Sequence, residues 1–320
     1  MLIPILLFLL GFVLLIKGGD WFVDGAVGIA HHFHLPELLI GATVVSIGTT
    51  LPEVMVSAQA AIEGNSGISY GNAIGSIICN TSLIAALTIA IRPSTARRKT
   101  LVLPIAAFFL SSVIYAAIAY TTGSFRRWQG ILFLAMFVLY LILSTMQMKR
   151  SPEAATEEES GEEVVMWKTL VGLVVGAAAI AFGARLLVDN GTIIAEALGV
   201  PSSVIGLTMV ALGTSLPELV TAITSLIKGH GALSLGNVIG ANLFNIVLVS
   251  GAAITIHPFA LPAEKTIAGM NASLVVDLPV MFTVMLLLCV PPLFKGRLYR
   301  WQGILLLMIY AGFTVFQFCF

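Results

Sequence analysis

Residues 41–87 read GATVVSIGTTLPEVMVSAQAAIEGNSGISYGNAIGSIICNTSLIAAL, and residues 206–252 read GLTMVALGTSLPELVTAITSLIKGHGALSLGNVIGANLFNIVLVSGA. The two segments lie 165 positions apart and align without a gap, with 17 identities in 47 positions. The same offset pairs Asp24 with Asp189, so the duplication extends beyond these segments. A repeat of this length indicates two copies of one structural unit.

The composition of the chain is that of a membrane protein. Of its 320 residues, 58% are hydrophobic and only 10% are charged, whereas a soluble domain carries about 25% charged residues. Apolar runs close to the roughly 20 residues that span a bilayer recur along the whole chain; they include 2–16, 101–120, 131–146, 170–182 and 278–294. The net charge is zero, which argues against a nucleic-acid partner. We therefore expect an all-α protein that contacts the lipid bilayer.

The spans divide into two halves of five. The motif RWQGI begins at Arg127 and again at Arg300, and it marks the last helix of each half. Because five is odd, the second half enters the membrane upside down, as in many secondary transporters. We predict about ten transmembrane helices in two inverted-topology five-helix repeats, residues 1–146 and 168–320. Residues 147–167 hold six glutamates and no apolar period, which is typical of a solvated cytoplasmic linker; weak calcium binding by these carboxylates is the alternative.

The basic residues predict the orientation. With the N-terminus outside, the inner loops hold Arg92, Arg97, Arg98, Lys99, Lys149, Arg150, Lys168, Lys228, Lys295, Arg297 and Arg300, and the outer loops hold Arg126, Arg127 and Lys265. Cytoplasmic loops are enriched in Lys and Arg. We therefore predict a multi-pass protein of the cell (inner) membrane with both termini extracytoplasmic.

Glu53 and Glu218 are the acidic residues in the middle of apolar spans, each in the same setting, GTTLPE and GTSLPE. A charge at this depth costs several kcal/mol, so such residues usually face a cavity and have a function. A buried, protonated glutamate that bonds a neighbouring helix is the structural alternative, but it does not explain two equivalent copies.

A proline precedes each glutamate. Pro52 and Pro217 lack an N–H and crowd the carbonyl four residues back, so we expect each helix to kink and to release backbone carbonyls at membrane depth. Irregular backbone is tolerated there where it lines a cavity or packs within protein, and a cation is a natural partner for the carbonyls. A kink solvated by a threonine hydroxyl is the alternative. Thr49 and Thr214, four residues before the glutamates, share their helical face.

The following span adds amide oxygens. Asn72, Ser76 and Asn80 form an i, i+4, i+8 stripe, whose repeat partner is Asn237, Ala241 and Asn245. An asparagine stripe is also typical of helix–helix contacts, and the neighbouring glycines favour that interpretation for the first asparagine of each stripe. Asn80 and Asn245 are the better ligand candidates. The whole set consists of hard oxygen donors, which suit calcium, magnesium or sodium rather than zinc or copper.

These motifs resemble the two alpha-repeats of the sodium/calcium exchanger family, and the match is closest to its small prokaryotic members. The resemblance rests on GTTLPE and GTSLPE, on GNAIGS and GNVIGA each followed by an asparagine, and on both RWQGI helices. It implies a secondary antiporter that exchanges Ca²⁺ for Na⁺ by alternating access, with these ions as substrates and no cofactor.

The resemblance also implies roles for individual residues. Central calcium ligands would be Glu53 and Glu218, with the Thr49 and Thr214 carbonyls and with Asn80 and Asn245; one flanking sodium site would be lined by Ser46, Thr50 and Ser76, and the other by Ala211, Ser215 and position 241. Close prokaryotic relatives carry Asp at position 245, and the family generally carries Ser at position 241. Ala241 therefore removes one hydroxyl from a flanking sodium site.

Other functions remain open on the sequence alone. Exchange of Ca²⁺ for H⁺, with Glu53 and Glu218 taking protons, is the alternative within transport. An intramembrane hydrolase would need a base beside Ser46 or Ser76, and no intramembrane His or Lys is placed to supply one. A structural or receptor protein would not predict duplicated buried glutamates. The cysteines at 79, 289 and 319 are scattered without metal or disulfide spacing, and we interpret them as small buried hydrophobes.

Overall fold

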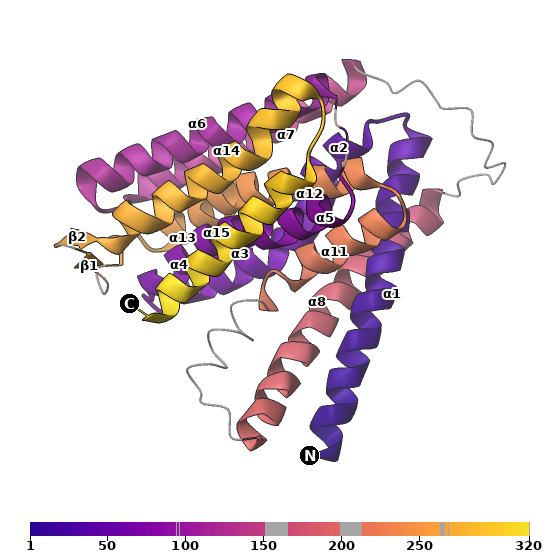
Figure 1. The fold of residues 1–320 in the computed structure, drawn as a ribbon, viewed down its shortest axis with the longest axis horizontal. Coiled ribbons are helices and arrows are strands. Elements are labelled where there is room, and N and C mark those ends of the chain that lie inside the picture. Colours follow the sequence, from indigo (N-terminus) through magenta and orange to yellow (C-terminus); the bar gives the residue numbers. More distant parts are fainter. Residues whose placement is uncertain are drawn as a thin grey trace.

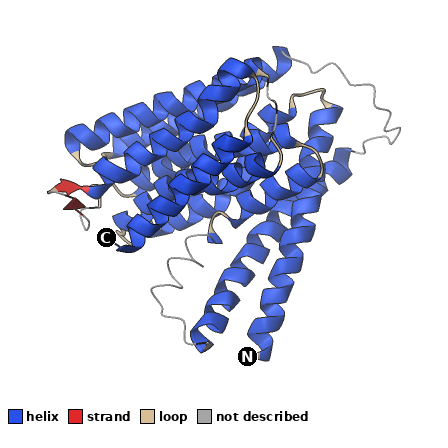
Figure 2. Ribbon diagram, in the orientation of Figure 1, coloured by secondary structure: helices blue, strands red, loops and turns tan. Residues whose placement is uncertain are grey.

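The computed structural model describes residues 1–93, 95, 97–150, 166–198, 213–262, 266–267 and 269–319. Almost all of these residues are helical, and a short antiparallel hairpin of β1 and β2 stands at one edge (Figure 2). The elements are α1 (Leu2–His32), α2 (Glu37–Ile40), η1 (Gly41–Val45), α3 (Ser46–Ile62), α4 (Ser66–Cys79), η2 (Asn80–Ala85), α5 (Ala86–Ile91), α6 (Arg98–Thr122), α7 (Arg127–Arg150), α8 (Met166–Ala197), α11 (Leu216–Ile227), α12 (Gly231–Phe244), η4 (Asn245–Ser250), α13 (Gly251–Ile256), β1 (Thr266–Ile267), β2 (Met270–Asn271), η5 (Ser273–Asp277), α14 (Leu278–Lys295) and α15 (Arg300–Cys319).

Eight helical segments of the described residues are long and apolar enough to cross a membrane. Three of them join an α-helix to a π-helical turn and a further helix, as in Glu37–Ile62, Ser66–Ile91 and Gly231–Ile256. Two further helices, the short apolar helix α11 and the 20-residue helix α15, are present in addition to these eight. The prediction of an all-α membrane protein is confirmed.

The RWQGI motifs tie each half of the chain to the other half. The Arg127 side chain donates to the Ile256 carbonyl over 3.3 Å, and the Arg300 side chain donates to the Ile91 carbonyl over 3.3 Å. Ile91 and Ile256 are 165 positions apart, so the two contacts are repeat-equivalent. Helix α7 therefore begins where α13 ends, and α15 begins where α5 ends.

The loops show that the two halves are inverted. Thr95 pairs with Arg297 beyond the ends of α5 and α14, whereas Ser124 pairs with Ala260 beyond the ends of α6 and α13. The 25-residue helix α6 separates these two ends of the bundle by roughly 37 Å, at 1.5 Å per residue. The equivalent helices α5 and α13 consequently end on opposite faces of the bundle, which we call the Thr95 face and the Ser124 face.

Helices α1 and α8 form an antiparallel pair that extends away from the rest of the bundle (Figure 1). Gly11 faces Gly183, and Gly18 faces Gly176; a Cβ on Gly11 would lie 2.8 Å from the Gly183 carbonyl oxygen, and one on Gly176 would lie 2.8 Å from the Gly18 oxygen. Small residues at these positions let the two backbones approach closely. Helix α1 ends near the Thr95 face, and helix α15 begins near it. The N-terminal end of α1 and the C-terminal end of α15 therefore both point toward the Ser124 face.

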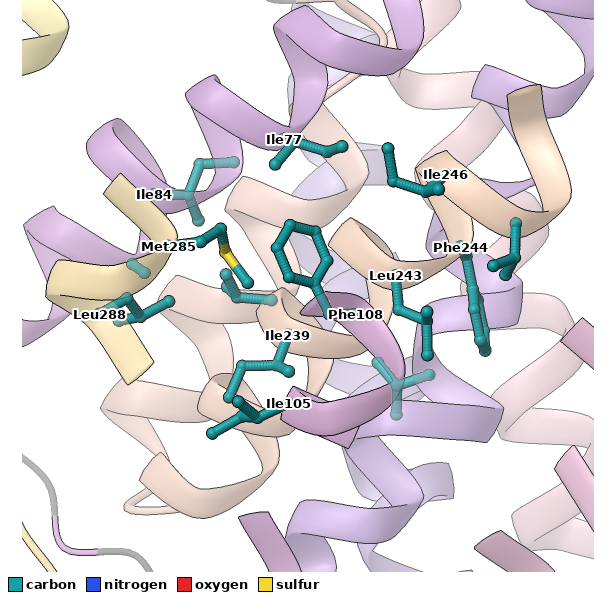
Figure 3. Packing of buried hydrophobic residues seen from close by; sticks show 14 of the residues in the cluster. Ile77, Ile84, Ile105, Phe108, Ile239, Leu243, Phe244, Ile246, Met285 and Leu288 are labelled. Carbon is teal, nitrogen blue, oxygen red and sulfur yellow. The ribbon is translucent and has the colours of Figure 1, made fainter. Parts of the chain in front are cut away.

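The apolar core packs α4 with η2, α6, α12 with η4, and α14 (Figure 3). Along the chain, Ile77 and Ile84 lie on either side of Asn80, and Phe244 and Ile246 flank Asn245. Both asparagines therefore have close-packed apolar residues of the core as chain neighbours.

Candidate ion-binding site

The site is built around two carboxylates from the two halves. Glu53 lies on α3 and Glu218 on α11, and both side chains are fully buried. They are near enough to interact electrostatically. Within the described residues, none of their four oxygens accepts a hydrogen bond, and no lysine or arginine pairs with them. Buried charges without a partner are strongly destabilising, so this arrangement calls for a bound cation or for protons.

The two asparagines predicted as ligands occupy equivalent positions in irregular helix. Asn80 is the first residue of the π-helical segment η2, and Asn245 is the first residue of η4. Both are fully buried, and neither side-chain atom of either residue has a hydrogen-bond partner in the described structure. The Ser250 hydroxyl donates to the Asn245 carbonyl over 2.9 Å. π-Helical turns inside α-helices frequently occur at functional sites because they shift backbone carbonyls out of the regular ladder.

This backbone differs from the kinked helix expected at Pro52. Helix α3 continues through Pro52 from Ser46 to Ile62, and the irregular turn η1 lies before it. Pro217 stands at the start of α11, where a proline needs no N–H and leaves no intrahelical bond unmade. Gly213 is helical, residues 214–215 form a turn before α11, and residues 199–212 lie outside the described part of the chain, so the kink expected at Pro217 stays a prediction.

The first flanking group joins α3 to α12. The Ser46 hydroxyl lies 2.8 Å from the Gly41 carbonyl oxygen and 3.0 Å from the Asn237 carbonyl oxygen, and the Thr49 hydroxyl donates to Asn237 Oδ1 over 3.2 Å. The Thr50 hydroxyl is buried without a partner among the described residues. Asn237, which the sequence assigned to helix packing, is thus both a helix–helix contact and a direct neighbour of two candidate ligands.

Asn72, on α4, is the repeat equivalent of Asn237. Its amide donates to the Glu53 backbone carbonyl over 3.1 Å and to the Ser57 hydroxyl over 2.8 Å. It therefore fixes the backbone that carries the central carboxylate. Sequence reasoning missed this role, although the i, i+4 stripe with Ser76 contained the signal.

The second flanking group lies at the start of α11. Ser215 is the residue before the helix, and its hydroxyl is buried without a partner in the described ranges. Thr214 lies in the preceding turn, and the Thr49 side chain approaches the Glu218 carboxyl. Ser76 is buried on α4, and Ala241 is buried on α12. Ala211 lies outside the described residues.

Cys79 is a further neighbour that sequence reasoning missed. It ends α4 one residue before Asn80, and its sulfur accepts a hydrogen bond from the Tyr310 hydroxyl over 3.8 Å. An isolated cysteine in apolar sequence gives no signal of such a neighbour. Its interpretation as one of three equivalent buried hydrophobes is incomplete, because the fold places it at the candidate site.

Comparison with known proteins identifies the family. The family model described as "Sodium/calcium exchanger protein" matches residues 3–146 and 168–319. The chain is 38% identical over 309 residues to an uncharacterized membrane protein of Methanocaldococcus jannaschii, covering 95% of this chain and 94% of the relative. It is 33% identical over 350 residues to the sodium/calcium exchanger MaX1 of Methanosarcina acetivorans, covering 98% of each chain.

A solved structure agrees with this assignment. The fold matches the sodium-calcium exchanger NCX_Mj, studied with 2.5 mM Na⁺ and 10 mM Sr²⁺, with a TM-score of 0.82 and 36% identity over 97% of each chain. The resemblance to small prokaryotic exchangers is thus confirmed, as is the prediction of a transporter rather than an enzyme. The chain belongs to the sodium/calcium exchanger family.

Proposed function

We propose that this protein exchanges Ca²⁺ for Na⁺ across the cell membrane by alternating access. The observation that carries the proposal is the repeat-related pair Glu53 and Glu218, fully buried at the heart of the fold with four carboxylate oxygens that accept no hydrogen bond from the described residues. Two carboxylates balance one divalent cation, and calcium prefers oxygen ligands of this kind.

Calcium binds between the two halves in this proposal. Its ligands are Glu53 and Glu218, the Thr49 and Thr214 carbonyls, and the amide oxygens of Asn80 and Asn245. Sodium binds on either side, at Ser46, Thr50 and Ser76 in one site and at Ala211, Ser215 and position 241 in the other. The unpartnered hydroxyls of Thr50 and Ser215 support these assignments, because a buried hydroxyl without a partner is costly.

The inverted architecture supplies alternating access. Residues 1–146 and 168–320 act as two equivalent repeats joined by the 147–167 linker, and the site lies where they meet. In transporters with inverted repeats, rocking or gating of one part against another opens the midplane site to each side in turn. The repeat-equivalent contacts of Arg127 and Arg300 on opposite faces are consistent with two such states of similar energy.

The orientation follows from the charges on the two faces. Arg92, Lys99, Lys149, Lys228, Lys295, Arg297 and Arg300 lie toward the Thr95 face. Arg126 and Arg127 lie toward the Ser124 face. By the positive-inside rule, the Thr95 face is cytoplasmic and both termini are extracytoplasmic.

The test is calcium-45 uptake into proteoliposomes that contain the purified protein. An outward sodium gradient should drive uptake, and a pH gradient of equal size without sodium should not. Uptake driven by protons alone would replace the proposal with Ca²⁺/H⁺ exchange, in which the same glutamates take protons.

Glu53→Gln and Glu218→Gln should each abolish uptake while retaining the elution volume of the folded protein, because one carboxylate cannot balance a divalent ion in a site of low dielectric constant. Near-normal uptake in either variant would remove the central-site assignment.

A further inference from the structure

Lys228 joins α11 to α1 through two carboxylates. Its Nζ lies 2.7 Å from Asp24 Oδ1 and 3.5 Å from Asp20 Oδ1, and it also donates to the Asp20 backbone carbonyl over 3.4 Å. We call these contacts the Lys228 cluster. Lys228 directly follows α11, the helix that carries Glu218, at the Thr95 face. The Lys228 cluster therefore connects a helix of the candidate site to the α1–α8 pair (Figure 1).

Close packing accompanies these contacts. A Cβ on Gly19 of α1 would lie 2.7 Å from Val220 Cγ1 and 2.8 Å from the Thr224 hydroxyl oxygen of α11. Val220 and Thr224 are accordingly only partly exposed, whereas their repeat equivalents on α3, Met55 and Gln59, are exposed. Helix α1 is thus docked on α11, and the described structure leaves the equivalent face of α3 uncovered.

The repeat equivalents of the charged residues have the opposite signs. The 165-residue offset pairs Lys228 with Glu63 and Asp20 with Arg185. Glu63 follows α3 as Lys228 follows α11, and their backbones agree, with φ and ψ of −76° and −3° at Glu63 and −74° and −4° at Lys228. A glycine with positive φ comes next in both halves. The two charges therefore stay complementary in each half, although both signs are reversed.

The second complementary pair is not formed in this conformation. Gln59 Nε2 donates to Glu63 Oε1 over 2.6 Å, and Arg185 Nε lies 3.5 Å from Asp189 Oδ2, one turn along α8. Among the ion pairs of the described residues, none joins Glu63 to Arg185. The Arg185 side chain is 80% exposed, and an exposed i, i+4 pair contributes little to stability. Arg185 can therefore exchange one carboxylate for another at little cost.

We propose that two ion pairs of reversed polarity hold the two conformations of the exchange cycle. The Lys228 cluster holds α1 against α11 in the conformation described here, and a pair between Glu63 and Arg185 holds α8 against α3 in the opposite one. The inference rests on the proposed function, because it assigns one contact to each of its two states.

The inverted architecture gives the physical reason. In transporters of this plan, one part moves against another around a fixed site, and the opposite state arises when each half takes the arrangement that the other half has here. Helix α8 then docks on α3 as α1 docks on α11, which brings Arg185 to Glu63. Because an exposed ion pair shifts an equilibrium only a few-fold, each pair biases the populations of the two states and neither prevents the exchange between them.

The test measures how often Glu63 and Arg185 approach each other. Cysteines replace both in the full chain, Glu63→Cys/Arg185→Cys, and a short bis-methanethiosulfonate reagent links thiols that come within reach. A protease site inserted between residues 150 and 166 lets cleavage separate the two halves on a denaturing gel unless the link has formed. The doubly substituted protein should be linked, and the single variants Glu63→Cys and Arg185→Cys should separate.

Addition of Lys228→Met should raise the rate of this linking by about two- to five-fold, the effect of losing one exposed ion pair. The matched control is Lys17→Met, because Lys17 also lies on the α1 side of this contact and makes no ion pair among the described residues. It should leave the rate unchanged. Absence of the link, or equal rates in Lys228→Met and Lys17→Met, would overturn the inference.

The reciprocal experiment reports the conformation described here. In the protein Asp20→Cys/Lys228→Cys, the same reagent should link α1 to α11, and Glu63→Gln should raise the rate of linking about two- to five-fold because it removes the competing pair. An unchanged rate in Glu63→Gln would contradict the proposed role of Glu63. Cross-linking is measured without transport, so absence of calcium uptake would overturn the transport proposal and leave the result on the two ion pairs standing.

Discussion

Replacement of Gly240 by alanine tests how the close contact between α12 and the η1–α3 segment supports the site. A Cβ at this position would lie 2.3 Å from the Ser46 hydroxyl oxygen, 2.6 Å from the Ala42 Cα and 2.7 Å from the Ala42 carbonyl oxygen. Non-bonded carbon atoms settle at about 3.5–4.0 Å. Because two of these neighbours are backbone atoms, a side-chain rotation cannot relieve the overlap, and the segments must separate by about 1 Å.

Two effects lower the free energy of unfolding in this variant. Overpacking of a tight contact costs about 1–3 kcal/mol. Displacement of Ser46 also weakens its hydrogen bonds to Gly41 and Asn237, a further loss of about 1 kcal/mol. We expect Gly240→Ala to lower the free energy of unfolding by about 2–4 kcal/mol and the melting temperature by several degrees. Sodium half-saturation of exchange should rise several-fold, because Ser46 is a proposed sodium ligand.

The assays are thermal unfolding of the purified protein in detergent and a sodium titration of calcium-45 flux. Gly312→Ala is the control, because a Cβ added to this exposed glycine of α15 would have no atom of the described residues within 4 Å. It should leave the sodium curve unchanged and should not lower the melting temperature, because alanine is a better helix former than glycine. An unaltered sodium curve in Gly240→Ala, despite the expected loss of stability, would show that Ser46 does not bind sodium; an unaltered melting temperature would refute the packing argument itself.

Three further substitutions probe other parts of the protein. Ala241→Ser should lower the sodium concentration for half-maximal exchange several-fold, since one hydroxyl contact is worth about 1 kcal/mol; an unmoved sodium curve would exclude position 241 from a sodium site. Asn72→Ala should reduce calcium affinity, because it removes the amide that holds the Glu53 carbonyl; equilibrium calcium binding equal to that of the unmodified protein would contradict this. Lys228→Met should cost less than about 1 kcal/mol of stability, because its partner Asp24 is largely exposed; a loss as large as that of Gly240→Ala in thermal unfolding would show that the pair matters more.

Much of this protein could be read from its sequence because membrane insertion and duplication leave strong local signals. A span must be apolar over its whole length, so the composition predicts the helices. A duplicated gene keeps equivalent residues at one offset, so 17 identities in two 47-residue segments single out Glu53 and Glu218. The two RWQGI motifs likewise predict equivalent helices, which the structure joins to opposite halves through Arg127 and Arg300.

The tertiary structure decided features that depend on what a residue meets across the bundle. The sequence places the backbone irregularity at Pro52 and Pro217, whereas α3 continues through Pro52 and the described structure adds π-helical turns that no proline marks, such as η1 directly before α3. Asn72 and Asn237 look like helix-packing residues in the sequence, and only the approach of α4 and α12 to α3 shows that they hold candidate ligands. Cys79 and Cys289 are equivalent in local sequence character, but long-range packing puts one against the Tyr310 hydroxyl of α15 and the other in the apolar core. Local sequence determines whether a segment enters the membrane as a helix; which side chains meet depends on contacts between segments far apart in the chain, and these are set by the fold as a whole.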